Sequence, residues 1–251
     1  MGVGVASALS ASKSGHKIYV ADKNASIVEK VTIQYGVESD QSYNGLSKAE
    51  AIIIAVKPQD LETLAADVGA KISEQTILLS IVAGVTIEKI QKLFRHDKVV
   101  RVMPNMGLKV GEGIAAWKSS ELSQSERERV NILLNDLSVN FEVNSEELID
   151  AVTAISGSGP AYFFLLAQAM EKSAQVLGLD KNQARLLVEK TLFSAAALQK
   201  GASYEDLIKS IASKGGTTEA ALKTFHSSGF EEMVEKAVRA AKKRSQELSN
   251  E

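Results

Sequence analysis

The chain has 251 residues, of which 45% are hydrophobic and 24% are charged. Both fractions are close to those of globular proteins, so the chain can bury one large core or two smaller ones. The 29 Lys and Arg nearly balance the 31 Asp and Glu, which excludes a strong net field for nucleic acid or an anionic membrane. The absence of cysteine excludes disulfides, a thiolate nucleophile and cysteine-based metal sites.

No apolar run reaches the length of a membrane span, and no signal peptide is visible. The three histidines, His16, His96 and His226, share no motif spacing, so each is expected at a surface or an interface. No metal site is predicted. We therefore expect a cytoplasmic protein that binds neither nucleic acid nor membrane.

The first half of the chain alternates helical and strand patterns. Helices are expected over residues 3–14, 25–36, 60–72 and 86–94. Apolar or β-rich runs predict strands over residues 17–22, 51–58, 76–84 and 98–105. Strands that alternate with helices of about ten residues predict parallel βαβ units.

The pattern changes after about Asp150. Helices are expected over residues 160–178, 181–200, 204–213, 217–225 and 230–247, and nothing after Val143 resembles a strand. The predicted fold is thus α/β plus all-α. A Rossmann-like parallel sheet domain over residues 1–145 is followed by a helical domain over residues 146–251.

Ligands of an open parallel sheet bind at the carboxyl ends of its strands. Asp22 ends one strand about twenty residues after the N-terminal glycines, where a dinucleotide-binding unit places a group that faces the adenosine ribose. Its carboxylate would accept hydrogen bonds from a ribose diol, whereas Lys23 would attract a 2′-phosphate. The pair leaves NADH versus NADPH open, and a polar strand-end turn is the plain structural alternative.

Two glycine-rich segments of the second half each allow two interpretations. In SKGGTTEAAL (residues 213–222), two glycines and two threonines precede a helix, whose free N–H groups favour an anion such as a carboxylate. Plain helix capping explains the same residues equally well. For SGSGPAY (residues 156–162) we favour a structural role, either capping or close helix packing.

AVKP, SIVAGVTI, RVMPN, DAVTAISGSGPAY and SKGGTTEAAL, in this order, resemble the pyrroline-5-carboxylate reductase family over essentially the whole chain. The resemblance implies an oxidoreductase with a Rossmann domain and a helical dimerisation domain. It implies hydride transfer from NADPH or NADH to the C=N carbon of 1-pyrroline-5-carboxylate. The product is L-proline, in the last step of proline biosynthesis, an amino-acid biosynthesis pathway. The expected assembly is a homodimer, and the helical half is compatible with a larger homo-oligomer, a ring of dimers.

Motif by motif, the resemblance also implies site residues. Together with Asp22 and Lys23, the expected cofactor-binding residues are Gly2, Asn44, Ala55, Val56, Lys57, Pro58, Ile81, Ala83 and Asn105. The substrate carboxylate is expected on Ser213, Gly215, Gly216 and Thr217. Thr218 would hydrogen-bond the ring nitrogen as an orienting catalytic group, and Glu146 is a candidate for closing the substrate site.

The chain departs from the family pattern at three places. Met106-Gly107 replaces Thr-Pro and Lys214 replaces Pro, which is expected to loosen two loops. Of the family's first strand and Gly-x-Gly-x-Met-Gly turn, only Met1-Gly2 is present. Because a buried mid-sheet strand contributes very roughly 10 kcal/mol, we expect the sequence to be truncated at its N-terminus.

These departures keep two alternatives open. One is a cofactor-impaired relative that acts as a dimeric binding or scaffold protein. The other is a reductase of another cyclic imine or of a small hydroxy acid.

Overall fold

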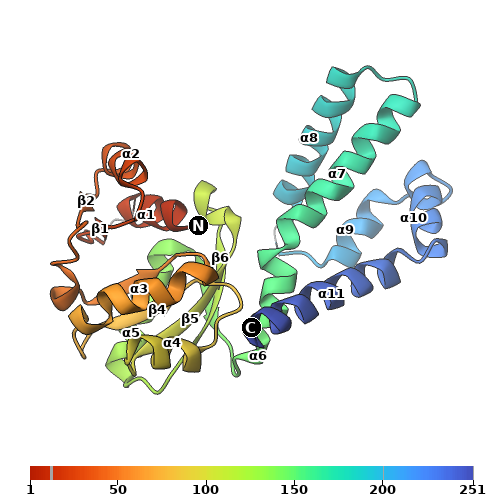
Figure 1. Ribbon diagram of the computed structural model, residues 1–251. Helices are drawn as coiled ribbons and strands as arrows, with labels where there is room; N and C mark the ends of the chain where they lie inside the picture. Colours follow the sequence, from red (N-terminus) through yellow and green to blue (C-terminus); the bar gives the residue numbers. More distant parts are fainter. Residues whose placement is uncertain (12–13, 200, 251) are drawn as a thin grey trace. The chain divides into compact units, whose positions relative to one another are not determined.

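The computed structural model describes residues 1–11, 14–199 and 201–250 (Figure 1). The chain packs into two compact units. The N-terminal unit comprises Met1–Ser158 together with Ala241–Glu251, and the helical unit comprises Gly159–Ala240. These packing units differ from the predicted domains, 1–145 and 146–251, because residues 146–158 and the end of the last helix pack with the N-terminal unit. That domain division stays a prediction.

The N-terminal unit contains a five-stranded sheet in the order β3-β4-β5-β6-β7. Its strands are β3 (Ala51–Ile54), β4 (Ile77–Ser80), β5 (Val99–Pro104), β6 (Ile114–Ser119) and β7 (Val139–Glu142). β3, β4 and β5 run parallel, β6 is antiparallel to β5, and β7 is parallel to β6. The parallel core of the predicted α/β domain is confirmed, whereas β6 and β7 were not predicted.

A second sheet contains two short parallel strands, β1 (Tyr19–Val20) and β2 (Glu38–Ser39). It is not hydrogen-bonded to β3. The first element is a helix, α1 (Gly2–Ala11), and within the described residues no strand precedes it. The strands of the described residues therefore form two separate sheets.

Helices lie on both faces of the larger sheet (Figure 1). They are α3 (Leu61–Val68), α4 (Ile87–Phe94), α5 (Gln124–Leu137) and the short α6 (Glu147–Val152), whereas α2 (Ala25–Tyr35) packs with α1 and β2. Because side chains alternate along a strand, Leu78 packs with α3 and α4 while Leu79 packs with α5. This alternation explains why the strand runs are apolar at nearly every position.

The helical unit contains α7 (Gly159–Val176), α8 (Lys181–Leu198), α9 (Tyr204–Ile211), α10 (Thr217–Ser227) and the first part of α11 (Phe230–Asn250). α7 and α8 pack side by side as a helical hairpin (Figure 1). Large apolar side chains on both helices are exposed, with Phe163 at 62% and Phe193 at 72%. The prediction of helices alone after Val143 is confirmed for the described residues.

The stretch Glu147–Val176 is long and apolar enough, by length and composition alone, to cross a membrane. The sequence-based expectation that no run reaches this length was therefore too strict. A single such helix is weak evidence for a membrane span, because the core helix of a soluble protein passes the same test.

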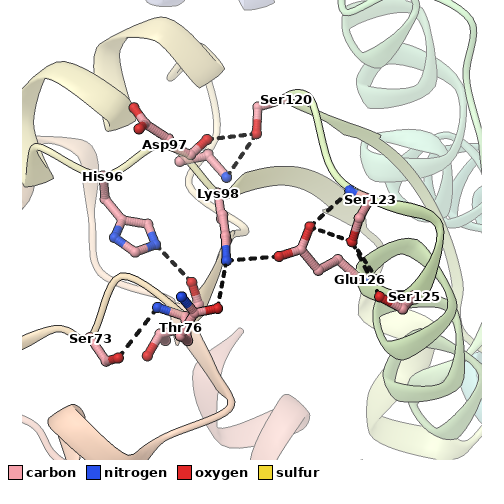
Figure 2. A network of polar contacts seen from close by, with 11 residues as sticks. Ser73, Thr76, His96, Asp97, Lys98, Ser120, Ser123, Ser125 and Glu126 are labelled. Atoms are coloured by element: carbon pink, nitrogen blue, oxygen red, sulfur yellow. Dashed lines mark hydrogen bonds and ion pairs between the residues drawn. The ribbon is translucent and has the colours of Figure 1, made fainter.

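A polar network ties together the amino ends of β4 and β5 and the start of α5, away from the ligand-binding strand ends (Figure 2). The ammonium of Lys98 lies 2.8 Å from Glu126 Oε1, and Ser123 donates its N–H to Glu126 Oε2 at 2.8 Å. His96 is buried, and its Nε2 lies 2.7 Å from the carbonyl oxygen of Thr76. The expectation of a surface or interface position is thus wrong for His96, whose imidazole joins the segments that precede β5 and β4.

Candidate active site

The N-terminus of α1 lies against the carboxyl end of β3. A Cβ atom built on Gly2 would lie 3.2 Å from the Cβ of Ala55, and one on Gly4 would lie 3.3 Å from Lys109 Cγ. Lys109 belongs to η4 (Met106–Val110), the short helix that follows β5. The structure therefore brings Gly2, Ala55 and the segment after Asn105 to one edge of the sheet, where parallel strands bind ligands.

Asp22 and Lys23 form the turn after β1. Asp22 Oδ1 accepts the backbone N–H of Asn24 at 2.8 Å, and Lys23 Nζ donates to Asp60 Oδ1 at 2.7 Å. This hydrogen bond, reinforced by the charge of Asp60, raises the pKa of Lys23. Asp60 closes the 3-10 turn η2 (Pro58–Asp60), so Lys23 lies beside the turn that follows β3.

The segment Ala55 to Pro58 leaves the sheet with Ala55, Lys57 and Pro58 exposed. Val56 is half-buried against the core of α3 and α4. Asn44 is exposed, and its backbone N–H donates to Asp40 Oδ1 at 3.0 Å. Asn44 is therefore held within its own loop, and no polar contact among the described residues joins it to the strand ends.

The loop after β4, residues 81–86, is termed the β4 loop below. The N–H of Ile81 donates to the carbonyl of Ile54 at 3.0 Å, which fixes the loop beside β3. Val82 and Val85 are buried in the core, whereas Ala83 is exposed. The loop thus presents Ala83 outward from a backbone that is anchored on both sides.

Asn105 organises the loop after β5 with its side chain. Its Oδ1 accepts the N–H groups of Gly107 at 3.1 Å and of Ile114 at 3.2 Å. The predicted cofactor residue is therefore also the group that shapes this turn.

Glu146 lies in a cluster of charges that the sequence analysis did not anticipate. Its Oε1 accepts the N–H of Ile87 at 2.9 Å and lies 3.0 Å from Nη1 of Arg101. The other arginine nitrogen, Nη2, lies 3.2 Å from Asp150 Oδ1. Arg101 has a side chain only 4% exposed. An arginine inside the apolar run VVRVMP was the one available sequence signal for this cluster, because a buried arginine requires acidic partners.

The segment 213–218 forms a turn followed by the N-terminus of α10. The N–H of Gly216 donates to the carbonyl of Ser213 at 2.9 Å, and Gly215 has φ of +75°. Gly216 occupies the N-cap position without a side-chain hydrogen bond, so Thr217 and Thr218 begin the helix with an uncapped end. Uncapped N–H groups at a helix N-terminus form an anion site.

Gly157, in the segment SGSGPAY, packs closely against the sheet. Thr153–Gly157 form a π-helical turn before α7, and a Cβ atom on Gly157 would lie 2.6 Å from Met103 Cε. A side chain at position 157 would require the terminal methyl of Met103 to move. This contact is between Gly157 and the sheet, so the capping or helix-packing role of SGSGPAY stays a prediction.

The parallel sheet, with its loops gathered at the carboxyl ends of the strands, defines the class of protein. It is an oxidoreductase with a Rossmann-like domain for a nicotinamide cofactor. Residues 1–84 match the family described as NADP oxidoreductase coenzyme F420-dependent, and residues 146–248 match pyrroline-5-carboxylate reductase dimerisation. The second match supports a homodimer.

Curated and solved relatives identify the family. The chain is 32% identical to a pyrroline-5-carboxylate reductase of Pseudomonas aeruginosa, over 94% of this chain and 88% of the relative. It is 36% identical to that of Haemophilus influenzae, over 84% and 79%. A pyrroline-5-carboxylate reductase structure from Coxiella burnetii superposes with a TM-score of 0.89 at 31% identity, over 98% of this chain and 94% of that one. The chain belongs to the pyrroline-5-carboxylate reductase family.

Proposed function

We propose that this chain reduces the C=N bond of 1-pyrroline-5-carboxylate to give L-proline, with NADPH or NADH as reductant. The observation that carries the proposal is the uncapped N-terminus of α10. The free backbone N–H groups at this helix end suit the carboxylate of this substrate. Thr218, the second residue of α10, adds a hydroxyl. We also propose that the reaction completes proline biosynthesis in the cytoplasm.

The substrate half of the proposed site needs no charged side chain. Gly215 and Gly216 leave the backbone open to close approach, and the N–H of Gly215 donates to Glu219 Oε2 at 2.6 Å, which holds the turn. Ser213, Thr217 and the first N–H groups of α10 then bind the carboxylate. Because the helix dipole adds partial positive charge at this end, an anion is favoured there over a neutral ligand.

Thr218 orients the ring nitrogen in this proposal. A protonated imine is already electrophilic, so the protein mainly positions two ligands and handles one proton. The hydroxyl of Thr218 can donate to or accept from the nitrogen as its protonation changes. Its role is orientation and proton relay, not strong acid catalysis.

The cofactor half fits a nicotinamide dinucleotide at the edge of the sheet. A reduced nicotinamide supplies a hydride when bound. A Cβ atom on Gly2 would make a tight 3.2 Å contact with the Ala55 Cβ, and the adjacent N-terminus of α1 offers backbone N–H groups to a phosphate. Val56, Lys57 and Pro58 line the next turn, while Ile81, Ala83 and Asn105 line the two loops beyond.

We propose NADPH as the preferred cofactor. Lys23 has a side chain 78% exposed and is bound only through its tip to Asp60, so it can turn to a 2′-phosphate. Asp22 favours NADH instead, because its carboxylate would accept hydrogen bonds from the ribose diol.

The helical unit is proposed to form the homodimer, and a larger ring of dimers remains an assembly to be measured. Phe163, Phe164 and Phe193 are more than half exposed on α7 and α8, a concentration that a partner surface would cover. Light scattering after size-exclusion chromatography gives the number of copies directly.

The proposal is tested by following NADPH and NADH oxidation with 1-pyrroline-5-carboxylate and by quantifying L-proline. Cofactor binding is measured separately by the fluorescence of NADPH. Turnover with proline as product supports the proposal, and a faster reaction with NADPH supports the cofactor choice. Binding of neither cofactor would instead indicate the dimeric scaffold protein. Binding with turnover of another cyclic imine alone would indicate the related reductase.

A further inference from the structure

The last helix, α11, begins in the helical unit and ends in the N-terminal unit. Residues 241–250, its final turns, pack with the elements that carry the proposed cofactor site. Two of its side chains make contacts that the proposed reaction does not itself require. We propose that these final turns of α11 position the β4 loop, and with it Ala83, for the cofactor.

Ser245 anchors the helix. Its side chain is buried, and its hydroxyl donates to Asp150 Oδ1 at 2.7 Å. The same Asp150 oxygen lies 3.2 Å from Arg101 Nη2. The final turns of α11 are therefore fixed to a buried ion pair between β5 and α6.

Leu248 lies directly on the β4 loop. Gly84 is buried, with φ of +68°, and a Cβ atom built on it would lie 2.6 Å from Leu248 Cβ and 3.0 Å from the Leu248 carbonyl carbon. The close approach involves backbone on both sides, so neither partner can move away by rotating a side chain. Since Ala83 is exposed and precedes Gly84, a shift of α11 would move the proposed cofactor contact.

The other end of the loop is fixed by the same charge cluster. The N–H of Ile87, the first residue of α4, donates to Glu146 Oε1, which also pairs with Arg101. Arg101 therefore connects the two groups that fix the β4 loop. One is Glu146, which binds the N–H of Ile87 after the loop, and the other is Asp150, which binds Ser245 on the helix that contacts Gly84. This arrangement makes Ser245 and Leu248 positioning residues, because neither is expected to touch the cofactor.

The inference rests on the proposed function, since it concerns the loop that holds the nicotinamide cofactor. The test uses the full chain, a chain without residues 248–251, and Ser245→Ala. Ser249→Ala is the matched control, because the bond that its hydroxyl makes among the described residues, to the carbonyl of Ser245, lies within α11. For each protein, the Kd and KM for NADPH, the KM for 1-pyrroline-5-carboxylate and the melting temperature are measured.

We expect the shortened chain to bind NADPH about fivefold or more weakly, the lower range of coupling between sites, with the KM for the imine unchanged. Ser245→Ala should shift binding in the same direction and Ser249→Ala should not. An unchanged Kd for NADPH in the shortened chain, or equal effects of the two serine changes, would overturn the inference. If the full chain bound no nicotinamide cofactor, the proposed function would fail first, so the two failures are distinguishable.

A double-mutant cycle adds a readout that loss of fold alone cannot imitate. Gly84→Ala and Gly36→Ala both place alanine at a left-handed glycine, with φ of +68° and +66°, but a Cβ atom on Gly36 would meet nothing within 4 Å. In the full chain, Gly84→Ala should weaken NADPH binding more than Gly36→Ala does. Without residues 248–251 this excess should disappear, and its persistence would contradict the contact.

Discussion

The ion pair of Lys98 and Glu126 predicts a defined loss of stability in acid. Glu126 accepts from Lys98 Nζ at 2.8 Å and from the N–H and the hydroxyl of Ser123, each at 2.8 Å (Figure 2). These hydrogen bonds lower the pKa of Glu126 from 4.5 to about 2. The bond with Lys98 contributes most, followed by those with Ser123. A carboxyl with a lowered folded-state pKa stabilises the fold above its unfolded pKa.

The magnitude follows from the size of this shift. A fall from 4.5 to about 2 corresponds to about 3 kcal/mol of linked stability at neutral pH. The Lys98 side chain is 23% exposed and that of Glu126 12%, so we discount this for screening to about 1–2 kcal/mol. The contribution is complete above pH 4.5 and is lost as the pH falls toward 2.

The assay is urea denaturation of the unaltered protein and of Glu126→Gln at fixed protein concentration, at several pH values between 7 and 2.5. The variant should be less stable at pH 7 by the amount above, and the difference between the two curves should shrink steadily as the pH falls toward 2.5. Glu128→Gln, an exposed carboxylate on the same helix with a neutral amide partner, is the control. A difference between Glu126→Gln and the unaltered protein that stayed constant with pH would refute the reasoning.

Three further predictions concern the site. Thr218→Ala should lower kcat/KM for 1-pyrroline-5-carboxylate by about tenfold or more through loss of one hydrogen bond, with the Kd for NADPH unchanged. If NADPH binding weakened by the same factor, Thr218 would not have the assigned role. Lys23→Ala should raise the KM for NADPH but not for NADH, and parallel changes would contradict a contact with the 2′-phosphate. Arg101→Ala should lower the free energy of unfolding by about 3–5 kcal/mol in chemical denaturation, because it leaves Glu146 and Asp150 without their cation. A loss below about 1 kcal/mol would show that water solvates these carboxylates.

The sequence carried clear signals for the parallel strands and for most helices. Continuous apolar runs predicted β3, β4 and β5, because strands covered on both faces need apolar residues at every position. The helix expected over residues 25–36 ends at Gly36, whose φ of +66° is the left-handed conformation common at helix C-termini. Local residue chemistry determines these features, so they are readable without knowledge of the partners in space.

The elements between residues 105 and 145 were missed, although one signal was present. Ser123 and Glu126 form a capping box at the start of α5, the S-x-x-E pattern that marks a helix N-terminus. β6 has an antiparallel partner in β5, which a pattern of βαβ units does not suggest. The Arg101 cluster was unpredictable for a different reason: its partners lie 45 and 49 residues away along the chain.

The two loops that differ from the family pattern are held by other interactions than proline. A Cβ atom on Gly107 would lie 2.3 Å from the carbonyl oxygen of Glu112, so this turn requires glycine where the family has proline. Its N–H is bound by Asn105, and its carbonyl accepts the N–H of Glu112 at 3.1 Å. In the turn of residues 213–218, the carboxylate of Glu219 accepts the N–H of Gly215, next to Lys214.

These hydrogen bonds and a proline act on different states of the chain. Proline stabilises mainly by restricting the unfolded chain, by about 0.4–1 kcal/mol, whereas the hydrogen bonds of Asn105 and Glu219 exist only in the folded protein. At Lys214, the loss of proline therefore lowers stability more than it alters the folded geometry of the turn, whereas the turn at Gly107 has no room for a proline ring. By this reasoning, Lys214→Pro should raise the melting temperature while leaving the KM for the imine unchanged. A lower KM would instead show that the turn at Lys214 is loose in the folded protein, as the sequence pattern led us to expect.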